Sequence, residues 1–231
     1  MKKFKLMTLL MCLAVLVSCN NTGKGALIGT GGGALLGAVV GKLAGNTAVG
    51  ATVGAAVGAG AGALIGKKMD KAAERAQAID NAKVEEITDA NGLKAVKVSF
   101  DSGILFSSGK SDLQPSAKAA LSDFAGVLKE FADTDVAIQG YTDNQGWRGS
   151  SATQSYEKNK QLSLQRAQSV LNYLTSQGVK YSQIKSCEGF GEENPVASNN
   201  TAAGQAQNRR VEVYMYASEA MINAANNGNL R

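Results

Sequence analysis

Histidine is absent from the 231 residues of this chain, which excludes Ser–His–Asp and Cys–His catalytic arrangements and every zinc site with an imidazole ligand. Cysteine occurs three times, as Cys12, Cys19 and Cys187, and no two of these form a CxxC pair. A thioredoxin-type redox motif and a cysteine-rich metal site are therefore excluded as well. Proline is scarce, whereas the 27 glycines are concentrated in one part of the chain. We expect neither a metal ion nor a cofactor.

The N-terminus has the features of a secretory leader. Lys2, Lys3 and Lys5 precede an apolar run, residues 6–17, that is too short to span a bilayer. The run ends in the sequence LVSC, which resembles a bacterial lipobox with Cys19 as its cysteine. The resemblance implies cleavage before Cys19, acylation of that cysteine and a mature chain of 213 residues. An ordinary signal peptide with a coincidental cysteine is the alternative.

Removal of this leader changes the charge balance and points to a location. Three lysines leave with it, so the formal net charge falls from +5 to +2, and we expect no nucleic-acid partner. A triacylated Cys19 would anchor the chain stably, because several acyl chains bind membrane far more strongly than one. Asn20 replaces the aspartate that retains lipoproteins at the inner membrane by the sorting rule of related envelopes. These features favour an outer-membrane lipoprotein with a periplasmic C-terminal domain and Cys187 as a free thiol.

A ladder of glycines occupies residues 25–66. The spacing is four residues, slips once to five between Gly45 and Gly50, and then returns to four. Residues four apart share one helix face, and glycines on that face let two helix backbones approach closely. The ladder therefore predicts two helices, about 25–45 and 48–66, folded as a hairpin. Each would be roughly 27–31 Å long, close to the thickness of a hydrocarbon core.

This segment resembles the glycine-zipper region of several outer-envelope lipoproteins. A flexible Gly/Ala linker is the alternative, and the sustained four-residue register disfavours it. The sequence leaves open whether the hairpin spans a membrane, lies in it or drives oligomer formation. Residues 67–83 are rich in alanine and charge, which predicts a solvated helical linker without chemistry.

The C-terminal part of the chain has the pattern of an α+β domain. Alternating apolar residues predict a hairpin over residues 84–100, with Asn91-Gly92 in its turn. Apolar stripes predict a helix that begins near Pro115 and a second helix over about 154–177. Further strands are predicted at residues 136–140, 184–188 and 210–217. The order β-β-α-β-α-β-β indicates a sheet with helices on one face.

Two features of this domain have the chemistry of a recognition site. Asp143 follows the strand that ends at Gly140, which places its carboxylate at the rim of the sheet. Asn159, Ser163 and Arg166 are spaced by four and three, so they share one face near the start of a helix. An acid and an arginine facing one pocket suit a zwitterionic amino-acid head, because Asp pairs with ammonium and Arg forks onto carboxylate. A simple salt bridge between the two is the alternative.

Three ordered motifs, GYTD, NKQLSLQRAQSVLNYL and GFGEENPVASNNTAAGQAQNRRVEV, resemble the OmpA-like peptidoglycan-binding domain over about residues 95–217. Members of this family bind the diaminopimelate of peptidoglycan stem peptides and cleave nothing. The resemblance implies an OmpA-like fold, in which a β-α-β-α-β-β sheet carries helices on one face. It also implies a peptidoglycan-binding site made of Asp143, Arg166, Asn159, Thr142 and Phe106. The NRR motif at residues 208–210 is interpreted mainly as structural.

The sequence departs from the family pattern in three places. The segment 144–158 is longer than the common spacing, and its Trp147 and Arg148 are predicted to form a lid or an extra contact. Ser107 stands where relatives often have Asp or Asn, and Gln205 stands where Arg is frequent. These departures concern the shape of the pocket more than its chemistry, which needs only an acid and an arginine.

The predicted organisation is a series of six segments. They are a lipoprotein signal peptide (1–18), a lipidated N-terminus (19–24), a glycine-zipper helical hairpin (25–66), a helical linker (67–83), an OmpA-like domain (84–218) and a C-terminal tail (219–231). The resemblance implies a non-enzymatic outer-membrane lipoprotein that tethers the membrane to peptidoglycan and can form homo-oligomers through the zipper. One alternative is a membrane-inserting or envelope assembly protein in which the hairpin carries the main role. Another is a wall hydrolase that uses acids among Glu188, Glu192 and Glu193.

Overall fold

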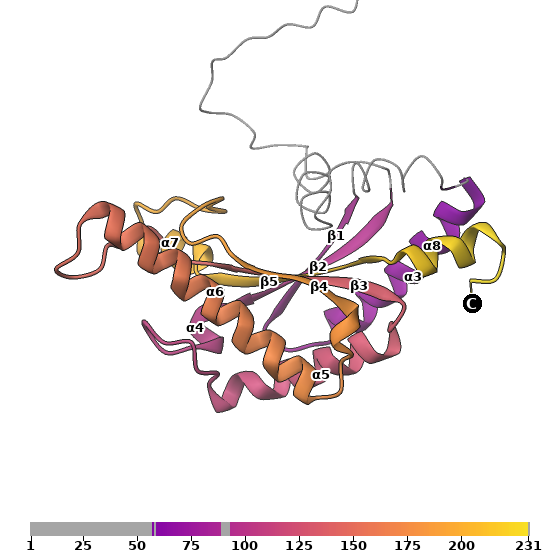
Figure 1. Ribbon diagram of the computed structural model, residues 1–231, viewed down its shortest axis with the longest axis horizontal. Helices are drawn as coiled ribbons and strands as arrows, with labels where there is room; N and C mark the ends of the chain where they lie inside the picture. The colour runs from indigo at the N-terminus through magenta and orange to yellow at the C-terminus, as the bar shows by residue number, and fades with distance from the viewer. Residues whose placement is uncertain (1–56, 58, 89–92, 231) are drawn as a thin grey trace, which may run out of the picture. The chain divides into compact units, whose positions relative to one another are not determined.

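The computed structural model of the chain describes residues 57, 59–88 and 93–230. Five strands form one sheet in the order β1-β2-β5-β3-β4 (Figure 1). They are β1 (Ala82–Thr88), β2 (Lys94–Asp101), β3 (Thr134–Tyr141), β4 (Ile184–Gly189) and β5 (Arg210–Ala217). Neighbouring strands are antiparallel except for the parallel pair β3 and β4. The predicted hairpin is confirmed as β1 and β2, with Val84 opposite Val98, whereas its predicted turn lies outside the described residues.

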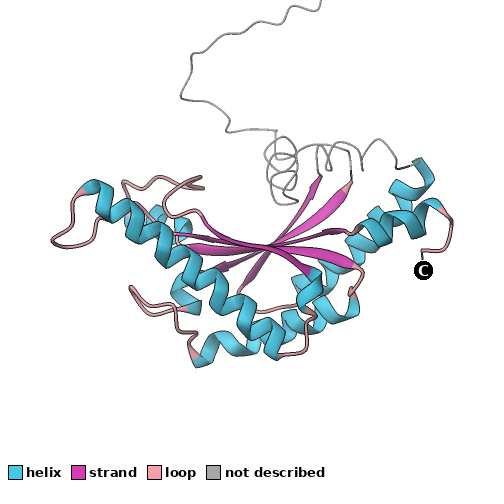
Figure 2. Cartoon of the chain, in the orientation of Figure 1, coloured by secondary structure: helices cyan, strands magenta, loops and turns pink. Residues whose placement is uncertain are grey.

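Helices cover one face of this sheet (Figure 2). The described residues form the helices α3 (Ala59–Gln77), α4 (Ser102–Leu105), α5 (Pro115–Glu130), α6 (Ala152–Ser176), α7 (Ala202–Asn208) and α8 (Glu219–Asn226), with the 3-10 helix η1 (Tyr181–Gln183). Of these, α3, α5 and α6 form the layer on the sheet. As predicted, Pro115 opens α5, because its fixed φ suits the first helical turn. Ser151 and Gln154 form a capping box that starts α6. Gly178 follows the C-cap of α6, and its φ of 91° is the left-handed conformation that terminates many helices.

The hydrophobic core lies between the sheet and these helices, because alternate strand residues point to one face. Val211, Val213 and Met215 of β5 are fully buried in one apolar cluster with residues of α5 and α6. Phe100 of β2 meets Phe124 of α5 edge to face, with ring centroids 5.6 Å apart. The α+β class, the order of the main elements and the helix-covered face are thereby confirmed.

Residues predicted as a solvated linker belong instead to this core. Helix α3 runs from Ala59 to Gln77, so it crosses the boundary predicted at residue 66. Ile65, Met69 and Ala73 are 0–1% exposed and lie in the main apolar cluster, where α3 packs against β1 and β2. The prediction of a solvated spacer was wrong because the buried stripe of α3 is built largely of alanine, whose burial gives only a weak hydropathy signal.

The predicted C-terminal tail also folds against the domain. The Ser218 hydroxyl accepts a hydrogen bond from the Met221 N–H and caps α8. Met221 and Ile222 are 1% and 5% exposed, and α8 packs against α3 (Figure 1). The folded domain therefore includes residues on both sides of the predicted range 84–218.

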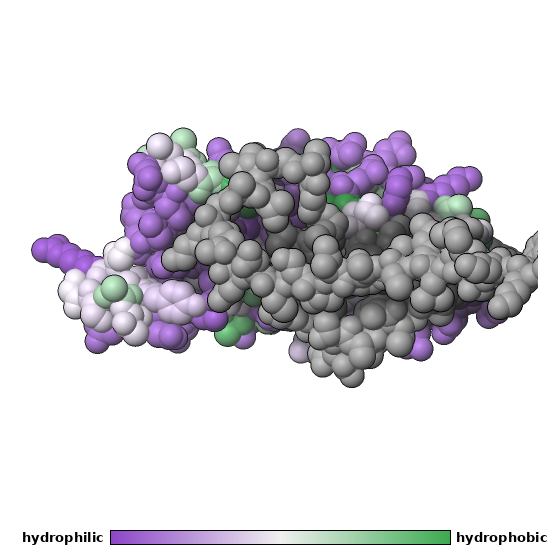
Figure 3. Space-filling model, turned by 90° about the horizontal axis from the view of Figure 1, so that it is seen from above, coloured by the Kyte–Doolittle hydropathy of each residue, from purple (hydrophilic) through white to green (hydrophobic). Residues whose placement is uncertain are grey.

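The leader, Cys19 and most of the glycine ladder lie outside the described residues, so the acylation site and the hairpin stay predictions. Within the ladder only residues 57 and 59–66 are described, and residues 59–66 are helical within α3. In the described part of the chain, no helix combines the length and the apolar character that a membrane span requires. Seen from above, the described surface is mainly hydrophilic, with few hydrophobic residues (Figure 3).

Candidate functional site

The chain that leaves β3 is held by contacts from two other elements. The N–H of Thr142 donates to the carbonyl of Gly191, in the loop after β4, at 2.7 Å. The guanidinium of Arg210, at the start of β5, lies 3.8 Å from the centroid of the Tyr141 ring in a cation–π contact. These contacts fix the backbone on both sides of the strand end, so the next residue, Asp143, leaves the sheet in a defined position.

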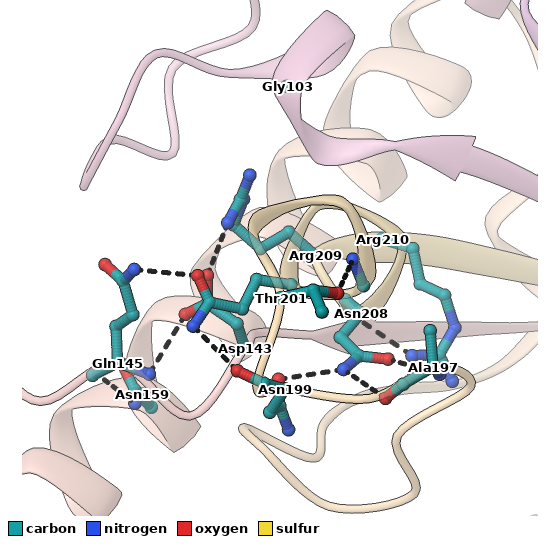
Figure 4. Close-up of polar contacts among 12 residues, drawn as sticks. Gly103, Asp143, Gln145, Asn159, Ala197, Asn199, Thr201, Asn208, Arg209 and Arg210 are labelled. Atoms are coloured by element: carbon teal, nitrogen blue, oxygen red, sulfur yellow. Dashed lines mark hydrogen bonds and ion pairs between the residues drawn. The ribbon is translucent and has the colours of Figure 1, made fainter.

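Asp143 is 7% exposed and engages both of its carboxylate oxygens. Its Oδ1 accepts a hydrogen bond from the N–H of Gln145 at 3.2 Å. Its Oδ2 accepts one from Nη1 of Arg209 at 2.5 Å, which makes an ion pair (Figure 4). The Asp143 carboxylate therefore already forms an ion pair with Arg209, and a ligand ammonium would be an additional partner for it.

The NRR motif, residues 208–210, supports the structure and also contributes a side chain to the candidate site. Asn208 is fully buried, and its Oδ1 accepts hydrogen bonds from the backbone N–H groups of Val196 and its neighbour at 2.8 and 2.9 Å. Arg210 donates through Nε to Glu212 at 2.8 Å on the sheet face opposite the helices. These two residues hold the loop and the sheet. Arg209, between them, reaches the candidate site, which the sequence interpretation missed.

Helix α6 brings a second set of polar residues to the same edge. Asn159, Ser163 and Arg166 share one buried face, as their spacing predicted, and are 4%, 0% and 4% exposed. The Asn159 Oδ1 accepts a hydrogen bond from the indole N–H of Trp147 at 2.7 Å. The Ser163 hydroxyl accepts one from the N–H of Gly191 at 2.8 Å, so it fixes the loop after β4.

Arg166 is a buried cation with most of its donors unused. Its guanidinium makes one hydrogen bond to a described residue, from Nε to the carbonyl of Lys110 at 3.0 Å, and lies 5.2 Å from the centroid of the Phe106 ring. Burial lowers the pKa of Arg166, the nearby charge of Arg209 lowers it further, and Asp143 partly offsets both. A buried guanidinium with unpaired N–H groups is costly, so the site favours an anion at this position.

A single cavity of about 710 Å³ collects these side chains. All five residues of the predicted site line it, namely Phe106, Thr142, Asp143, Asn159 and Arg166. The volume lies within the range of small-molecule sites. The cavity wall also contains two buried hydroxyls, those of Thr142 and Ser102, which have no hydrogen-bond partner among the described residues. The cavity therefore offers a carboxylate, guanidinium groups and free hydroxyls to a polar ligand.

Residues outside the predicted set complete the wall. Segment 144–158 forms a loop and the first turns of α6, and its Trp147 and Arg148 line the cavity, as does Ser107. The unusual length of this segment was the signal that drew attention to Trp147. Ser102, at the start of α4, carried no recognisable signal in the sequence.

The described residues contain no cluster of three or more acids or cysteines placed to hold a metal ion. Of the glutamates considered for hydrolysis, Glu193 accepts hydrogen bonds from Tyr156 at 2.5 Å and Lys160 at 3.0 Å. Glu192 lies 3.5 Å from the Asn159 amide, and Glu188 is exposed on β4. These three carboxylates do not line the cavity.

The fold and the cavity define an α+β binding domain whose pocket presents one carboxylate beside a buried arginine. Residues 105–209 match the OmpA family, and residues 1–70 match the YMGG-like Gly-zipper. Residues 105–209 of the chain are therefore similar to the OmpA family, and residues 1–70 are similar to the YMGG-like Gly-zipper.

Curated relatives are similar to part of the chain, and a solved structure has a similar fold. Probable lipoprotein YiaD of Escherichia coli (strain K12) is 38% identical over 141 residues, which cover 58% of this chain and 60% of YiaD. Peptidoglycan-binding protein ArfA of Mycobacterium tuberculosis (strain ATCC 25618 / H37Rv) is 41% identical over 110 residues, 48% of this chain and 31% of ArfA. The matched parts thus span at most 60% of these relatives. The crystal structure of a putative MotB like protein from Desulfovibrio vulgaris shares the fold, with a TM-score of 0.58, 20% identity, and coverage of 68% of this chain and 99% of that chain.

Proposed function

We propose that this chain is an outer-membrane lipoprotein that binds peptidoglycan non-covalently and tethers the membrane to the cell wall. The ligand in the wall is the diaminopimelate of stem peptides. The observation that carries the proposal is the buried Arg166, with unpaired N–H groups, in the same cavity as Asp143. The lipobox-like sequence before Cys19 and the names of two relatives, a lipoprotein and a peptidoglycan-binding protein, support it.

The proposed contacts follow from the chemistry of the ligand. The free end of diaminopimelate carries an ammonium and a carboxylate on one carbon. The ammonium pairs with Asp143, and the carboxylate accepts two parallel hydrogen bonds from Arg166. The Phe106 ring beside the guanidinium keeps it in place, and burial strengthens the ion pair by lowering the local dielectric. The unpaired Thr142 hydroxyl is a further contact to the head.

The binding test uses the full-length protein, purified in detergent and sedimented with purified peptidoglycan sacculi. Asp143→Asn and Arg166→Met each remove one charge from the site, and we expect binding to weaken about 10- to 100-fold, the usual worth of charge-assisted hydrogen bonds. Lys118→Met is the matched control, because Lys118 is exposed on α5 outside the cavity. Thermal unfolding of each variant checks that the fold survives.

Wild-type and Lys118→Met proteins should sediment alike. Equal sedimentation of wild type and Arg166→Met, with both folded, would refute the proposed site. Absence of wild-type binding to sacculi would refute the proposed function itself.

We also propose that the domain has no catalytic activity. Hydrolysis of a glycosidic bond needs two carboxyl groups that flank it, and Asp143 is the one carboxylate among the described residues that line the cavity. Incubation of the protein with sacculi should therefore release no soluble muropeptides. Release of such fragments, lost in Asp143→Asn, would show an enzyme instead.

A second function, oligomer formation through the glycine ladder, is favoured by the match of residues 1–70 to the YMGG-like Gly-zipper. Gly37→Leu and Gly54→Leu place bulky side chains in the four-residue register and should abolish detergent-stable oligomers. Ala38→Leu, outside the register, is the control. Light scattering of the purified proteins in detergent measures their mass, and unchanged oligomers in both glycine variants would exclude this function.

A further inference from the structure

A second cavity, which we call the α3 cavity, lies where α3 meets the end of α5 and the C-terminal residues of the chain. Its volume is about 390 Å³, within the range of small-molecule sites. Its wall includes Leu64, Lys67, Lys68, Lys71, Glu130 and Leu230. The lysines outnumber the acid, and the leucines add apolar surface beside them. This combination suits a ligand with a negatively charged head and a hydrocarbon chain.

The three lysines are held to different degrees. Nζ of Lys68 lies 2.5 Å from the Asp133 carboxylate, and the Lys68 side chain is 21% exposed, so this cation has a defined position. Nζ of Lys71 lies 3.5 Å from a Glu130 oxygen, beyond a normal hydrogen bond, and both residues are exposed. Such a pair contributes little stability, so Lys71 can turn to a ligand at small cost. Lys67 is exposed and has no ion-pair partner among the described residues.

The apolar part of the wall lies next to these cations. Leu64 is 41% exposed, which is unusual for a large hydrophobic side chain in the described part of the protein. Leu64, Lys68 and Lys71 are spaced by four and three, so they share one face of α3. Leu230, near the C-terminus, adds a second leucine to the same wall. A hydrocarbon chain along Leu64 and Leu230 would remove their apolar surface from water.

The α3 cavity and the candidate peptidoglycan site lie at opposite ends of β3. Asp133 precedes this strand and pairs with Lys68, whereas Asp143 follows the strand and lines the candidate site. The eight residues of β3 span about 26 Å. In Figure 1, α3 and α8 lie at one end of the sheet, and α4 and α7 lie at the other. The domain therefore has a cationic cavity at the end away from the candidate site.

We propose that the α3 cavity binds an anionic phospholipid of the membrane that holds the lipid anchor. The phosphate of the lipid accepts hydrogen bonds from the ammonium groups of Lys67 and Lys71, and the acyl chain covers Leu64 and Leu230. Charge complementarity supports this occupant, because basic residues close to a membrane attract anionic lipids. The sequence supports it as well. Lys67 directly follows the glycine ladder, which leads back to the anchor at Cys19.

This inference rests on the membrane attachment in the proposed function and adds an orientation to it. A phospholipid in the α3 cavity would turn this end of the domain toward the membrane. The opposite end, with the candidate site, would then face the cell wall. The lipid contact thus directs the pocket toward its ligand in addition to strengthening the anchor.

The test uses the full-length protein in a nonionic detergent and native mass spectrometry, which resolves bound lipid molecules. The probes are dioctanoyl phosphatidylglycerol, which is anionic, and dioctanoyl phosphatidylcholine, which has the same chains and no net charge. Wild-type protein should bind the anionic lipid about 25-fold more tightly, which is about fivefold for each of two lysines. Lys67→Gln and Lys71→Gln should each lose about fivefold of this preference.

Arg75→Gln is the matched control for these variants. Arg75 lies four residues after Lys71 and approaches the same Glu130 carboxylate at 3.5 Å, but it does not line the α3 cavity. The variant removes an equal charge from the same face of the helix. It should keep the wild-type preference for the anionic lipid.

Glycerophosphoglycerol, the head group of phosphatidylglycerol without its acyl chains, tests the apolar wall. Isothermal titration calorimetry should show that it binds at least about tenfold more weakly than the dioctanoyl lipid, because it buries no hydrocarbon. Leu64→Ala should weaken binding of the dioctanoyl lipid and leave binding of the head group unchanged. Thermal unfolding of this variant should match that of the wild type.

Equal binding of the two lipids by the wild type, or a preference that persists in the double variant of Lys67 and Lys71, would overturn the inference. An equal loss of preference in Arg75→Gln would reject the cavity in favour of the general charge of α3. Head-group binding as tight as that of the lipid would reject a membrane phospholipid as the ligand. Sedimentation with sacculi tests the proposed function separately, since both lysine variants should sediment like the wild type. Failure of the wild type to sediment would overturn peptidoglycan binding while lipid binding stands.

Discussion

Two glycines allow the strands that carry the site to touch α6 directly. A Cβ on Gly140 would lie 2.1 Å from the carbonyl oxygen of Ser163, and one on Gly189 would lie 2.3 Å from the backbone N of Leu164. Both obstacles are backbone atoms, which cannot move away as a flexible side chain can. The distance between the exit of β3 and the polar face of α6 therefore depends on these two residues.

We expect Gly140→Ala to lower the free energy of unfolding by about 1–3 kcal/mol or more, because it overpacks a close backbone contact. Gly126→Ala is the control, since a Cβ there, within α5, meets nothing within 4 Å. It should stabilise the protein by about 0.5–1 kcal/mol through the better helix propensity of alanine. Urea denaturation measures both. Equal stability of the two variants would show that the β3–α6 contact is looser than described.

The thiol of Cys187 is a titratable group whose pKa depends on its burial. Its position in β4 partly buries the thiol, and this burial, with a smaller effect of Glu188, raises the pKa of Cys187 to about 11. The folded protein thus holds the proton that the unfolded chain releases near pH 8.5. The stability from this group is complete below that pH and is lost as the pH rises toward 11.

Since the thiolate is the nucleophile, Cys187 should react with iodoacetamide at pH 8 at least tenfold more slowly in the folded protein than in urea. Mass spectrometry of the peptide that contains Cys187 measures the rate apart from the other cysteines. Similar rates with and without urea would contradict the burial described for this side chain.

At the residue level, the sequence was informative where a local pattern sets direction. Asp143 follows a strand, and the spacing of Asn159 and Arg166 defines a helix face, so their meeting at one edge was predictable. The role of Arg209 depends on how the long loop after β4 returns to the sheet before β5. No periodicity encodes that path, and the residue was assigned a structural role for this reason.

At the level of elements, α3 shows why domain boundaries were harder to predict. The ladder of glycines and the following charged residues differ in composition, and the boundary was placed between them at residue 66. The structure has one helix across that point, because Ile65, Met69 and Ala73 recur at helical spacing and share a buried face. The amino-acid composition changes near residue 66, whereas the buried face of α3 continues across that point.

We expect Met69→Ala in full-length protein to cost about 2–5 kcal/mol of stability, the usual loss for a large-to-small change in a core. Leu64→Ala on the same helix should change stability by less than about 0.5 kcal/mol, because Leu64 is 41% exposed. Chemical denaturation compares the two. A small effect of Met69→Ala would mean that α3 is an accessory linker after all.

At the level of the whole molecule, the proposed tether has two ends that act through one chain. Lipid on Cys19 would hold the protein in the membrane, and the pocket around Arg166 would hold the wall. Attachment of one end, by the lipid or by the pocket, confines the chain near its surface. The other end then meets its partner at a high effective concentration. Weak binding by a single pocket is therefore compatible with firm attachment of membrane to wall.

This arrangement predicts how the protein distributes when each end is removed. Cys19→Ser should leave the membrane fraction and remain partly with sacculi, whereas Arg166→Met should stay in the membrane and no longer sediment with sacculi after detergent extraction. The double variant should be found in neither fraction, since it has lost both attachments. Cell fractionation with immunodetection measures all three, with Lys118→Met as the control that behaves like wild type. If Cys19→Ser remains membrane-bound even when its leader, residues 1–18, is replaced by a cleavable signal peptide without a lipobox, the glycine ladder rather than the lipid holds that end, and the anchor must be sought in residues 25–66.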